Sequence, residues 1–251
     1  MSQMVDISPS QQRPLLLLSS RPWNGALADR LGQRLNRRVE MMASPCQFKQ
    51  EAVAKINPEW IFVPHWSHWI PETIWSTWPT VIFHMTDLPY GRGGSPLQNL
   101  IQRGHTSTMI SALRCEAGLD TGDVYLKRPL SLLGSAEEIF LRADKVIEDM
   151  IECIVREKPI ATPQKGEAVV FSRRTPDQSD LGKCSRGDIH SWHNQIRMLD
   201  AEGYPHAYLD VNGMRLEFRR VAQRSDGLHA DVKITPITAS QRVSEKPPYD
   251  D

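Results

Sequence analysis

Apolar and polar positions alternate along the first half of the chain in blocks that predict a parallel α/β sheet. The run "PLLLL" at residues 14–18 is wholly apolar, which is typical of a strand buried on both faces. Apolar runs of this kind alternate with segments in which leucines recur at helical spacing. We therefore expect a Rossmann-like, mainly parallel sheet with helices on both faces. Its strands are predicted at residues 13–20, 37–43, 58–66 and 79–84, and its helices at 25–37, 46–56 and 71–79.

The second half of the chain changes character after a long amphipathic helix predicted at residues 135–157. Ser135 and Glu138 have the spacing of a capping box at its start. Beyond it, Asn212-Gly213 predicts the tight turn of a hairpin. We expect a catalytic domain over residues 1–160 and a small, mostly β C-terminal domain over 161–251. The other elements predicted here are helices at 95–104 and 188–200 and strands at 106–115, 123–132, 168–174, 206–221 and 228–237.

Composition narrows the class of protein. Lys and Arg together number 30, as do Asp and Glu, so bulk charge gives no reason to bind nucleic acid or an anionic membrane. The four cysteines form no close pair, which is typical of a reduced, cytoplasmic protein. No apolar run is long enough to span a membrane, and the first residues lack the apolar core of a signal peptide. We expect a cytoplasmic protein without a membrane partner, with nucleic acid unlikely and a homodimer left open.

Candidate chemistry gathers where predicted strands end, because ligands of parallel sheets bind beyond the carboxyl ends of the strands. His84 closes one predicted strand, and His65 lies at the end of another. The glycines of the loop after His84 suit positive φ angles better than a phosphate site, since neither a dinucleotide fingerprint nor a P-loop is present. A metal at His65, His68 and His84 lacks convincing ligand spacing, so we expect no metal.

Two stretches together carry a resemblance to a known family. The first contains a histidine followed by prolines, a glycine and a glutamine, and the second reads "GLDTGD" at residues 118–123. The step of 36 residues from His84 to Asp120 agrees with the spacing of the family's catalytic pair. The pattern resembles the formyltransferases that use 10-formyltetrahydrofolate, over roughly residues 60–130 and more weakly before them. The residues of the first stretch are His84, Pro89, Gly93, Pro96 and Gln98.

The resemblance implies an enzyme, a formyl donor and a set of site residues. His84 and Asp120 match the catalytic residues, with the carboxylate orienting the imidazole and favouring its positive charge near a developing oxyanion. The donor would be 10-formyltetrahydrofolate. Its predicted binding residues are Trp66, Ser67, His68, Ile70, Cys115, Glu116 and Gly118. The predicted acceptor-binding residues are Tyr90, Gly91, Arg92, Gly93, Gly94, Arg173 and Arg174. For the two loop arginines, contact with a phosphorylated acceptor and a solvated basic turn remain equally open.

Ile82 departs from the family's pattern, which has an asparagine at this position that is held to stabilise the oxyanion. Losing one such donor commonly costs about 10²–10³ in rate. Either another group has replaced the asparagine or the chain is a weaker or different catalyst. Thr86, Asn99 and backbone N–H groups are the substitutes that the sequence offers.

The acceptor is predicted from the charge of the chain and the length of its second domain. A neutral chain with a short second domain favours the amine of a nucleotide-linked amino-sugar, as in the sugar N-formyltransferases that the chain resembles most. The alternatives are a methionyl-tRNA formyltransferase-like enzyme and a non-catalytic protein that binds folate or a nucleotide sugar. An amino-acid acceptor and hydrolysis of formyltetrahydrofolate also remain open.

Overall fold

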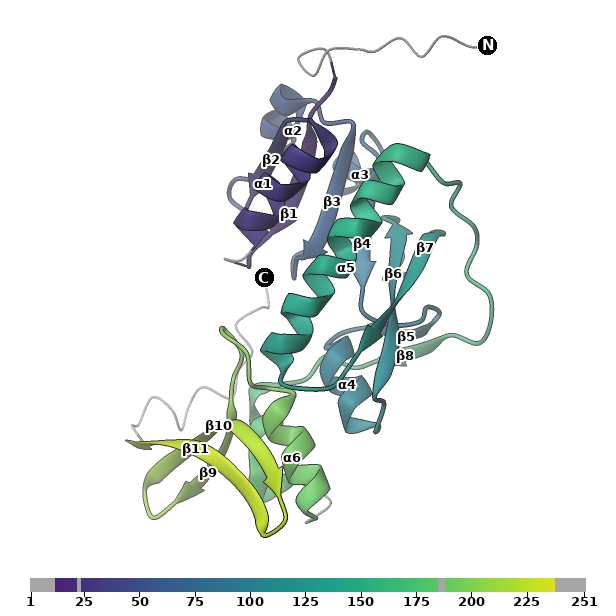
Figure 1. Cartoon of the computed structure of the whole chain (residues 1–251). Helices are drawn as coiled ribbons and strands as arrows, with labels where there is room; N and C mark the ends of the chain where they lie inside the picture. Colours follow the sequence, from purple (N-terminus) through teal and green to yellow (C-terminus); the bar gives the residue numbers. More distant parts are fainter. Residues whose placement is uncertain (1–11, 22–23, 185–187, 238–251) are drawn as a thin grey trace. The chain divides into compact units, whose positions relative to one another are not determined.

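The computed structural model describes residues 12–21, 24–184 and 188–237 (Figure 1). The chain divides into two compact units, each built from several segments of sequence. The first unit comprises Met1–Arg92, Met109–Leu130 and Arg142–Val169, and the second comprises Gly93–Thr108, Ser131–Leu141 and Val170–Asp251. The division expected from the sequence at residue 160 stays a prediction.

A six-stranded sheet forms the framework of the first unit, in the order β2-β1-β3-β4-β6-β7. The first four strands in this order run parallel, and β6 runs antiparallel to β4. The expected Rossmann-like, mainly parallel sheet is thereby confirmed, and the reversal at β6 is a feature that the alternation of elements did not reveal. The strands are β1 (Leu15–Ser19), β2 (Val39–Met42), β3 (Trp60–His65), β4 (Thr80–His84), β6 (Ser107–Arg114) and β7 (Val124–Ser131).

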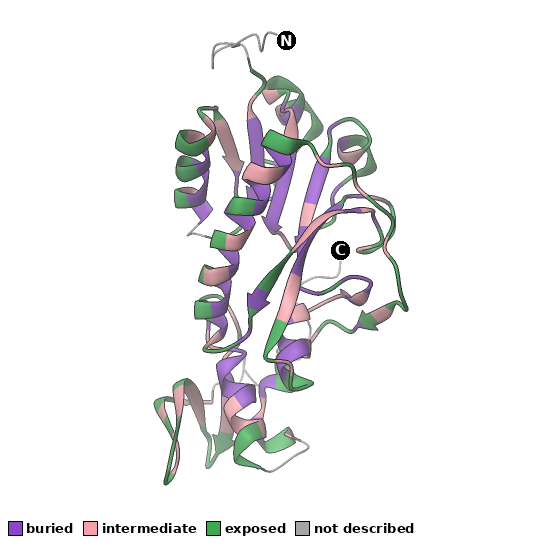
Figure 2. Ribbon diagram, turned by 45° about the vertical axis from the view of Figure 1, so that its right-hand side comes forward, coloured by how far each residue is buried: buried purple, intermediate pink, exposed green. Residues whose placement is uncertain are grey.

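Helices cover both faces of this sheet, as its apolar strands require (Figure 1). On one face, Val53 and Ile74 pack in a buried cluster with side chains of β1 and β3, among them Leu16 and Ile61. Figure 2 shows the central strands buried and the helices exposed on their outer sides. The helices are α1 (Asn24–Leu35), α2 (Gln50–Ile56), α3 (Glu72–Trp75) and α5 (Ala136–Glu157).

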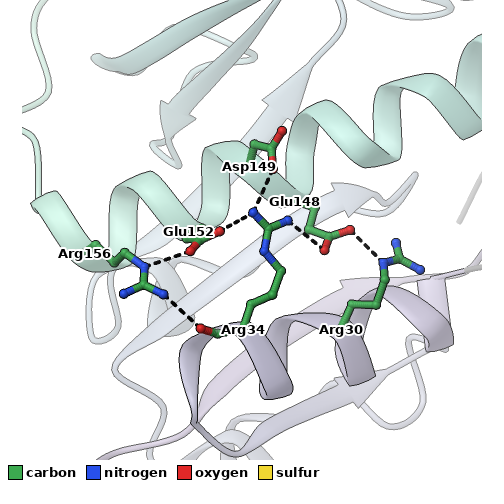
Figure 3. A network of polar contacts seen from close by, with 6 residues as sticks. All are labelled: Arg30, Arg34, Glu148, Asp149, Glu152 and Arg156. Carbon is green, nitrogen blue, oxygen red and sulfur yellow. Dashed lines mark hydrogen bonds and ion pairs between the residues drawn. The ribbon is translucent and has the colours of Figure 1, made fainter.

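Ion pairs join α1 to α5 on the other face (Figure 3). Glu148 is buried and accepts from Arg30 at 2.7 Å and from Arg34 at 3.0 Å. Arg34 also contacts Asp149 and Glu152, and hydrogen bonds to Glu148 and Asp149 raise its pKa. A network of this kind fixes the register of two helices, whereas one exposed pair would contribute little.

In its described residues, the second unit contains an antiparallel sheet, two complete α-helices, the first residues of α5 and two short 3-10 helices. The sheet has the order β11-β10-β9, and α6 contacts β10. Gln98 of α4 donates to the backbone oxygen of Met198 just beyond α6. The elements are α4 (Pro96–Gln102), α6 (Ile189–Arg197), β9 (Ala207–Val211), β10 (Met214–Arg224), β11 (Gly227–Pro236) and the short 3-10 helices η2 (Pro176–Ser179) and η3 (Leu181–Lys183). Two short strands, β5 (Tyr90–Gly93) and β8 (Val169–Phe171), pair separately.

Local signals in the sequence are confirmed at two places. Asn212 and Gly213 both have positive φ, at 50° and 77°. Positive φ at both central residues is typical of the two-residue hairpin turn whose twist matches that of its strands. At the start of α5, the backbone N–H of Glu138 donates to Ser135 Oγ, and Glu138 Oε2 accepts from the backbone N–H of Ser135. Among the described residues, no helix combines the length and the apolar character that a membrane crossing requires.

Candidate active site

His84 occupies the last position of β4, where the sheet holds it firmly. The strand pairs His84 with Ser111 of the antiparallel β6, and the hydroxyl of Ser111 donates to the backbone oxygen of Thr86 at 2.7 Å. His84, Thr86 and Ser111 are all buried. The imidazole is therefore placed by a strand end on one side and by the first residues of the following loop on the other.

Both ring nitrogens of His84 face oxygen atoms. Nε2 lies 2.7 Å from the backbone oxygen of Gly91. Because a carbonyl oxygen only accepts, Nε2 must carry a proton. Nδ1 lies 3.6 Å from Oδ2 of Asp120, which is an ion-pair distance but too long for a hydrogen bond. The structure thus brings together the two residues that the sequence predicted as a pair, with side chains only 8% and 9% exposed.

Asp120 reaches His84 from the loop that follows β6, and Gln164 supports that loop. Asp120 adopts a φ of 52°, which is uncommon for a residue with a side chain. The amide of Gln164 donates to the backbone oxygens of Asp120 and Gly122, at 2.8 and 2.9 Å. Its Oε1 accepts from Arg92, which was predicted to bind the acceptor. Gln164 lies in a stretch that reads as a linker, so nothing in the sequence pointed to this role.

The glycine loop after His84 has the backbone that its composition predicted. Gly91 and Gly93 take positive φ angles of 78° and 99°. A Cβ on Gly94 would lie 2.5 Å from the Cβ of Arg173, so that only glycine allows this approach. Gly93, Gly94, Arg173 and Arg174 belong to the second unit and are described with it.

The predicted basic pair in the second unit divides into an engaged residue and an exposed one. Arg174 donates to the side chain of Gln102 and to the backbone oxygen of Gln178. Its backbone N–H donates to Ser95. Arg173 is exposed. Arg174 therefore has a structural part in joining the loop to α4, which the sequence did not indicate.

Three of the seven residues predicted to bind the donor meet in one apolar cluster of the first unit. Ile70 and Cys115 are buried in it, with Trp66 and Trp75 packed against it. Ser67 and His68 are exposed, and the ring of His68 lies 5.4 Å from that of Trp66. Burial raises the pKa of Cys115 to about 12, with the charges of Asp120 and Glu116 adding to the effect.

A cavity of about 450 Å³ opens beside this cluster. Cys115 and Glu116, which were predicted, line it together with residues that were not: Trp75, Ser76, Arg114 and Ala117. Nε1 of Trp66 is buried without a hydrogen-bond partner among the described residues, which is rare for an indole N–H. The cavity itself offers the carboxylate of Glu116 and the aromatic ring of Trp75, whereas Trp66 belongs to the neighbouring cluster. Gly118 keeps the loop compact, since a Cβ there would collide with Thr121.

Ile82 packs where the family has its asparagine, and the proposed substitutes are already engaged. Ile82 contacts two buried apolar clusters. The hydroxyl of Thr86 donates to the backbone oxygen of Gly91 at 3.3 Å. The amide of Asn99 donates to the backbone oxygens of Gly94, Ser95 and Ser172. Two of the three substitutes that the sequence offered, Thr86 and Asn99, thus already donate to backbone oxygens.

A second histidine–aspartate pair was not predicted. Nε2 of His65, at the end of β3, lies 2.9 Å from Oδ1 of Asp144 on α5. Oδ2 of Asp144 accepts from the amide of Asn24 at 2.8 Å, and the other end of that amide contacts the hydroxyl of Ser19. The pair occupies His65, so a metal there would compete with Asp144. In the part of the chain that the structure describes, no three His, Cys, Asp or Glu side chains are grouped to hold a metal ion.

Comparisons with known proteins agree on one family. The family model for the C-terminal domain of methionyl-tRNA formyltransferase matches residues 176–235. The chain is 42% identical to the solved methionyl-tRNA formyltransferase from Clostridium thermocellum, covering 89% of this chain and 99% of that one, with a TM-score of 0.85. It is 26% identical to the methionyl-tRNA formyltransferase of Sulfurovum sp., over 67% of this chain and 55% of that protein. The chain thus spans little more than half the length of this curated relative.

Sugar N-formyltransferases are more distant. A Mycobacterium tuberculosis protein titled a likely sugar N-formyltransferase is 18% identical, covers 85% of this chain and 99% of its own, and has a TM-score of 0.67, which shows the fold alone.

The prediction of a nucleotide-sugar acceptor with nucleic acid unlikely is wrong, because the more similar proteins are methionyl-tRNA formyltransferases. The error came from the length of the second domain and from net charge, which averages over the chain, whereas β10 alone carries Arg215, Arg219, Arg220 and Arg224. The expected family is confirmed, and its members use 10-formyltetrahydrofolate as formyl donor. The chain belongs to the formyltransferase family and is methionyl-tRNA formyltransferase-like.

Proposed function

We propose that this protein transfers the formyl group of 10-formyltetrahydrofolate to the amino group of methionyl-tRNA. The observation that carries the proposal is the buried pair of His84 and Asp120 at the end of β4. The pair lies in a chain whose whole described fold follows that of a methionyl-tRNA formyltransferase. The names of the relatives support methionyl-tRNA as the acceptor, and the histidine–aspartate pair supports the transfer chemistry.

The donor supplies a formyl carbon whose bond to the folate nitrogen is exchanged for a bond to the acceptor nitrogen, while one amine proton passes to the folate nitrogen. Nε2–H of His84 now donates to the backbone oxygen of Gly91. We assign this N–H to the formyl oxygen during transfer, where it stabilises negative charge. Asp120 holds the ring from the Nδ1 side and can accept the amine proton before it moves on.

The donor would be held by the cluster that contains Trp66, Ile70 and Cys115. Nε1 of Trp66 offers a donor without a protein partner, and Glu116 offers an acceptor at the adjoining cavity. The other predicted donor-binding residues, Ser67, His68 and Gly118, lie in the same two loops as Trp66 and Glu116. A folate ring bound there gains both an apolar face and polar contacts along one edge.

The acceptor would be recognised through the glycine loop and the basic loop. Gly91 and Gly93 let the backbone approach an extended substrate closely, with Tyr90 and Arg92 alongside. The exposed Arg173 is free to meet a phosphate of the tRNA, whereas Arg174 is engaged by Gln102 and Gln178.

The four cysteines are all free thiols, which supports the cytoplasm as the predicted compartment.

A formylation assay with paired variants tests the proposal. The protein is incubated with 10-formyltetrahydrofolate and methionyl-tRNA, and formylmethionine is quantified by mass spectrometry. His84→Ala and Asp120→Asn should each lower turnover by about 10²-fold or more, in line with the loss of a general acid–base or electrostatic group.

A third histidine–aspartate pair, on the surface, provides the matched control. His229 and Asp226 form an exposed pair 3.0 Å apart in the β10–β11 hairpin, so His229→Ala and Asp226→Asn should keep wild-type turnover. Wild-type rates in both His84→Ala and Asp120→Asn would reject the catalytic assignment. Formylation of an amino-sugar nucleotide without formylation of methionyl-tRNA would reject the acceptor.

A further inference from the structure

A cavity of about 500 Å³ lies within the second unit, away from every residue assigned above to formyl transfer. This volume falls in the range of small-molecule sites, about 300–1,000 Å³. Side chains of α6, of the start of α5 and of β10 line it. Its polar lining includes Glu138, His190, His193, Asn194, Arg197 and Asp200.

Arg197, the last residue of α6, is a buried cation that has no acidic partner in the described part of the chain. It is only 9% exposed. Nε donates to Oδ1 of Asn194 at 2.8 Å, and Nη1 donates to the backbone oxygens of Leu132 and Gly134, at 2.6 and 3.0 Å. These bonds use three of the five N–H groups of a guanidinium. Within the described ranges, Nη2 donates to no residue, and no carboxylate lies within ion-pair distance of Arg197.

The three hydrogen bonds explain how Arg197 joins α6 to the turn before α5, but they leave its charge uncompensated. Burial lowers the pKa of Arg197, which reflects the cost of keeping this charge away from water. Buried charges in proteins are usually paired or coordinated. A cation that lines a cavity and lacks a protein counter-ion points to an anion from outside the chain.

Two histidines line the cavity beside Arg197 along α6. His190, His193 and Arg197 follow the spacing of one helix face. Oδ1 of Asn194 accepts from Arg197, so its amide nitrogen donates to Nε2 of His190 at 3.2 Å, which leaves Nδ1 as the donor of that ring. The pKa of His193 is lowered by burial and then by the charges of Arg197 and His190. Each of these groups gains from a negative charge placed between them.

Two carboxylates in the lining indicate which groups the rest of the ligand carries. Oε2 of Glu138 accepts from Ser135, and Oδ2 of Asp200 accepts from the backbone N–H of Arg220 at 2.7 Å. Each carboxylate has a second oxygen that can accept further hydrogen bonds. Hydroxyl groups suit these acceptors, whereas a second anionic group would be repelled.

We propose that this cavity binds a small hydroxylated phosphomonoester, with its phosphate against Arg197 and His193 and its hydroxyls toward Glu138 and Asp200. A guanidinium matches the geometry and charge of a phosphate. Because Arg197 is recessed, a terminal phosphate on a small molecule can reach it.

Calorimetric titration of the full chain tests the site with ribose 5-phosphate, ribose and inorganic phosphate as probes. Ribose 5-phosphate should bind with a dissociation constant below about 1 mM, inorganic phosphate more weakly, and ribose not measurably. His193→Ala and Arg197→Lys should each weaken ribose 5-phosphate at least about tenfold. His229→Ala, a histidine outside the cavity, should leave the affinity unchanged.

His193 is half-buried and its side chain makes no hydrogen bond to another described residue, so its variant keeps the test valid if Arg197→Lys fails to fold. No binding of ribose 5-phosphate by the wild-type chain up to about 10 mM would overturn the proposal. Equal affinity in His193→Ala and wild type would also overturn it. So would loss of methionyl-tRNA binding in His193→Ala with ribose 5-phosphate unaffected, which would assign the cavity to RNA.

Discussion

Replacing Asp144 by alanine should destabilise the first unit strongly, although the residue lies outside the predicted site. Asp144 is 5% exposed and accepts from Asn24 at 2.8 Å while facing His65 at 2.9 Å. Asn24 is fully buried, so its amide would have no water to replace the lost acceptor. Each orphaned buried donor costs about 1–3 kcal/mol. Two of them give an expected loss of about 2–5 kcal/mol, since removing the carboxylate also removes its own desolvation cost.

The measurement is the melting temperature by scanning calorimetry, where a loss of this size corresponds to about 5–15 °C for a chain of this length. Asp149→Ala is a matched control on the same helix, because the Asp149 side chain is 67% exposed and pairs only with Arg34. An exposed pair contributes about 0–1 kcal/mol. If Asp144→Ala lowered the melting temperature no more than Asp149→Ala, the argument that this buried network holds β3 to α5 would be refuted.

Three other outcomes follow from local structure. Ile82→Asn should not raise formylation tenfold and should cost about 1–3 kcal/mol by placing an amide among apolar side chains; a large gain in turnover would show a catalyst impaired by Ile82. Gly213→Ala should cost about 1 kcal/mol in thermal unfolding, purely through its φ of 77°, since no atom lies within 4 Å of the added Cβ; unchanged stability would contradict this. With a pKa raised to about 12, Cys115 should resist a thiol reagent at pH 8 while the exposed Cys46 reacts, as peptide mapping would show, and equal labelling would count against its burial.

The order of elements was predictable because burial imposes different periods on strands and helices. The all-apolar run of β1 and the leucines of α1 carry that signal without ambiguity. The capping box at Ser135 and the Asn212-Gly213 turn were equally readable, since each depends on residues that are neighbours in sequence. Strand direction is different: nothing in the pattern of β6 distinguishes an antiparallel strand from a parallel one.

The candidate site was predictable only where a family pattern preserved it. His84 and Asp120 were paired by resemblance, and the structure supplies the 3.6 Å between them. Gln164 and Asp144 could not be found, because their partners lie 44 and 79 residues away in the chain and no local rule joins them. The acceptor was misjudged for a related reason: total charge says nothing about how arginines gather on one strand.

The backbone oxygen of Gly91 accepts from both Nε2 of His84 and the hydroxyl of Thr86, and this has a consequence for chemical labelling. Acylating reagents attack a ring nitrogen that carries a lone pair and can be reached. In His84 one nitrogen holds a proton bound to Gly91, and the other faces Asp120, with only 7% of the residue exposed. Histidine-directed labelling of the free protein will therefore mark surface residues such as His229 first. A survey of reactive histidines would pass over the residue that we expect to matter most.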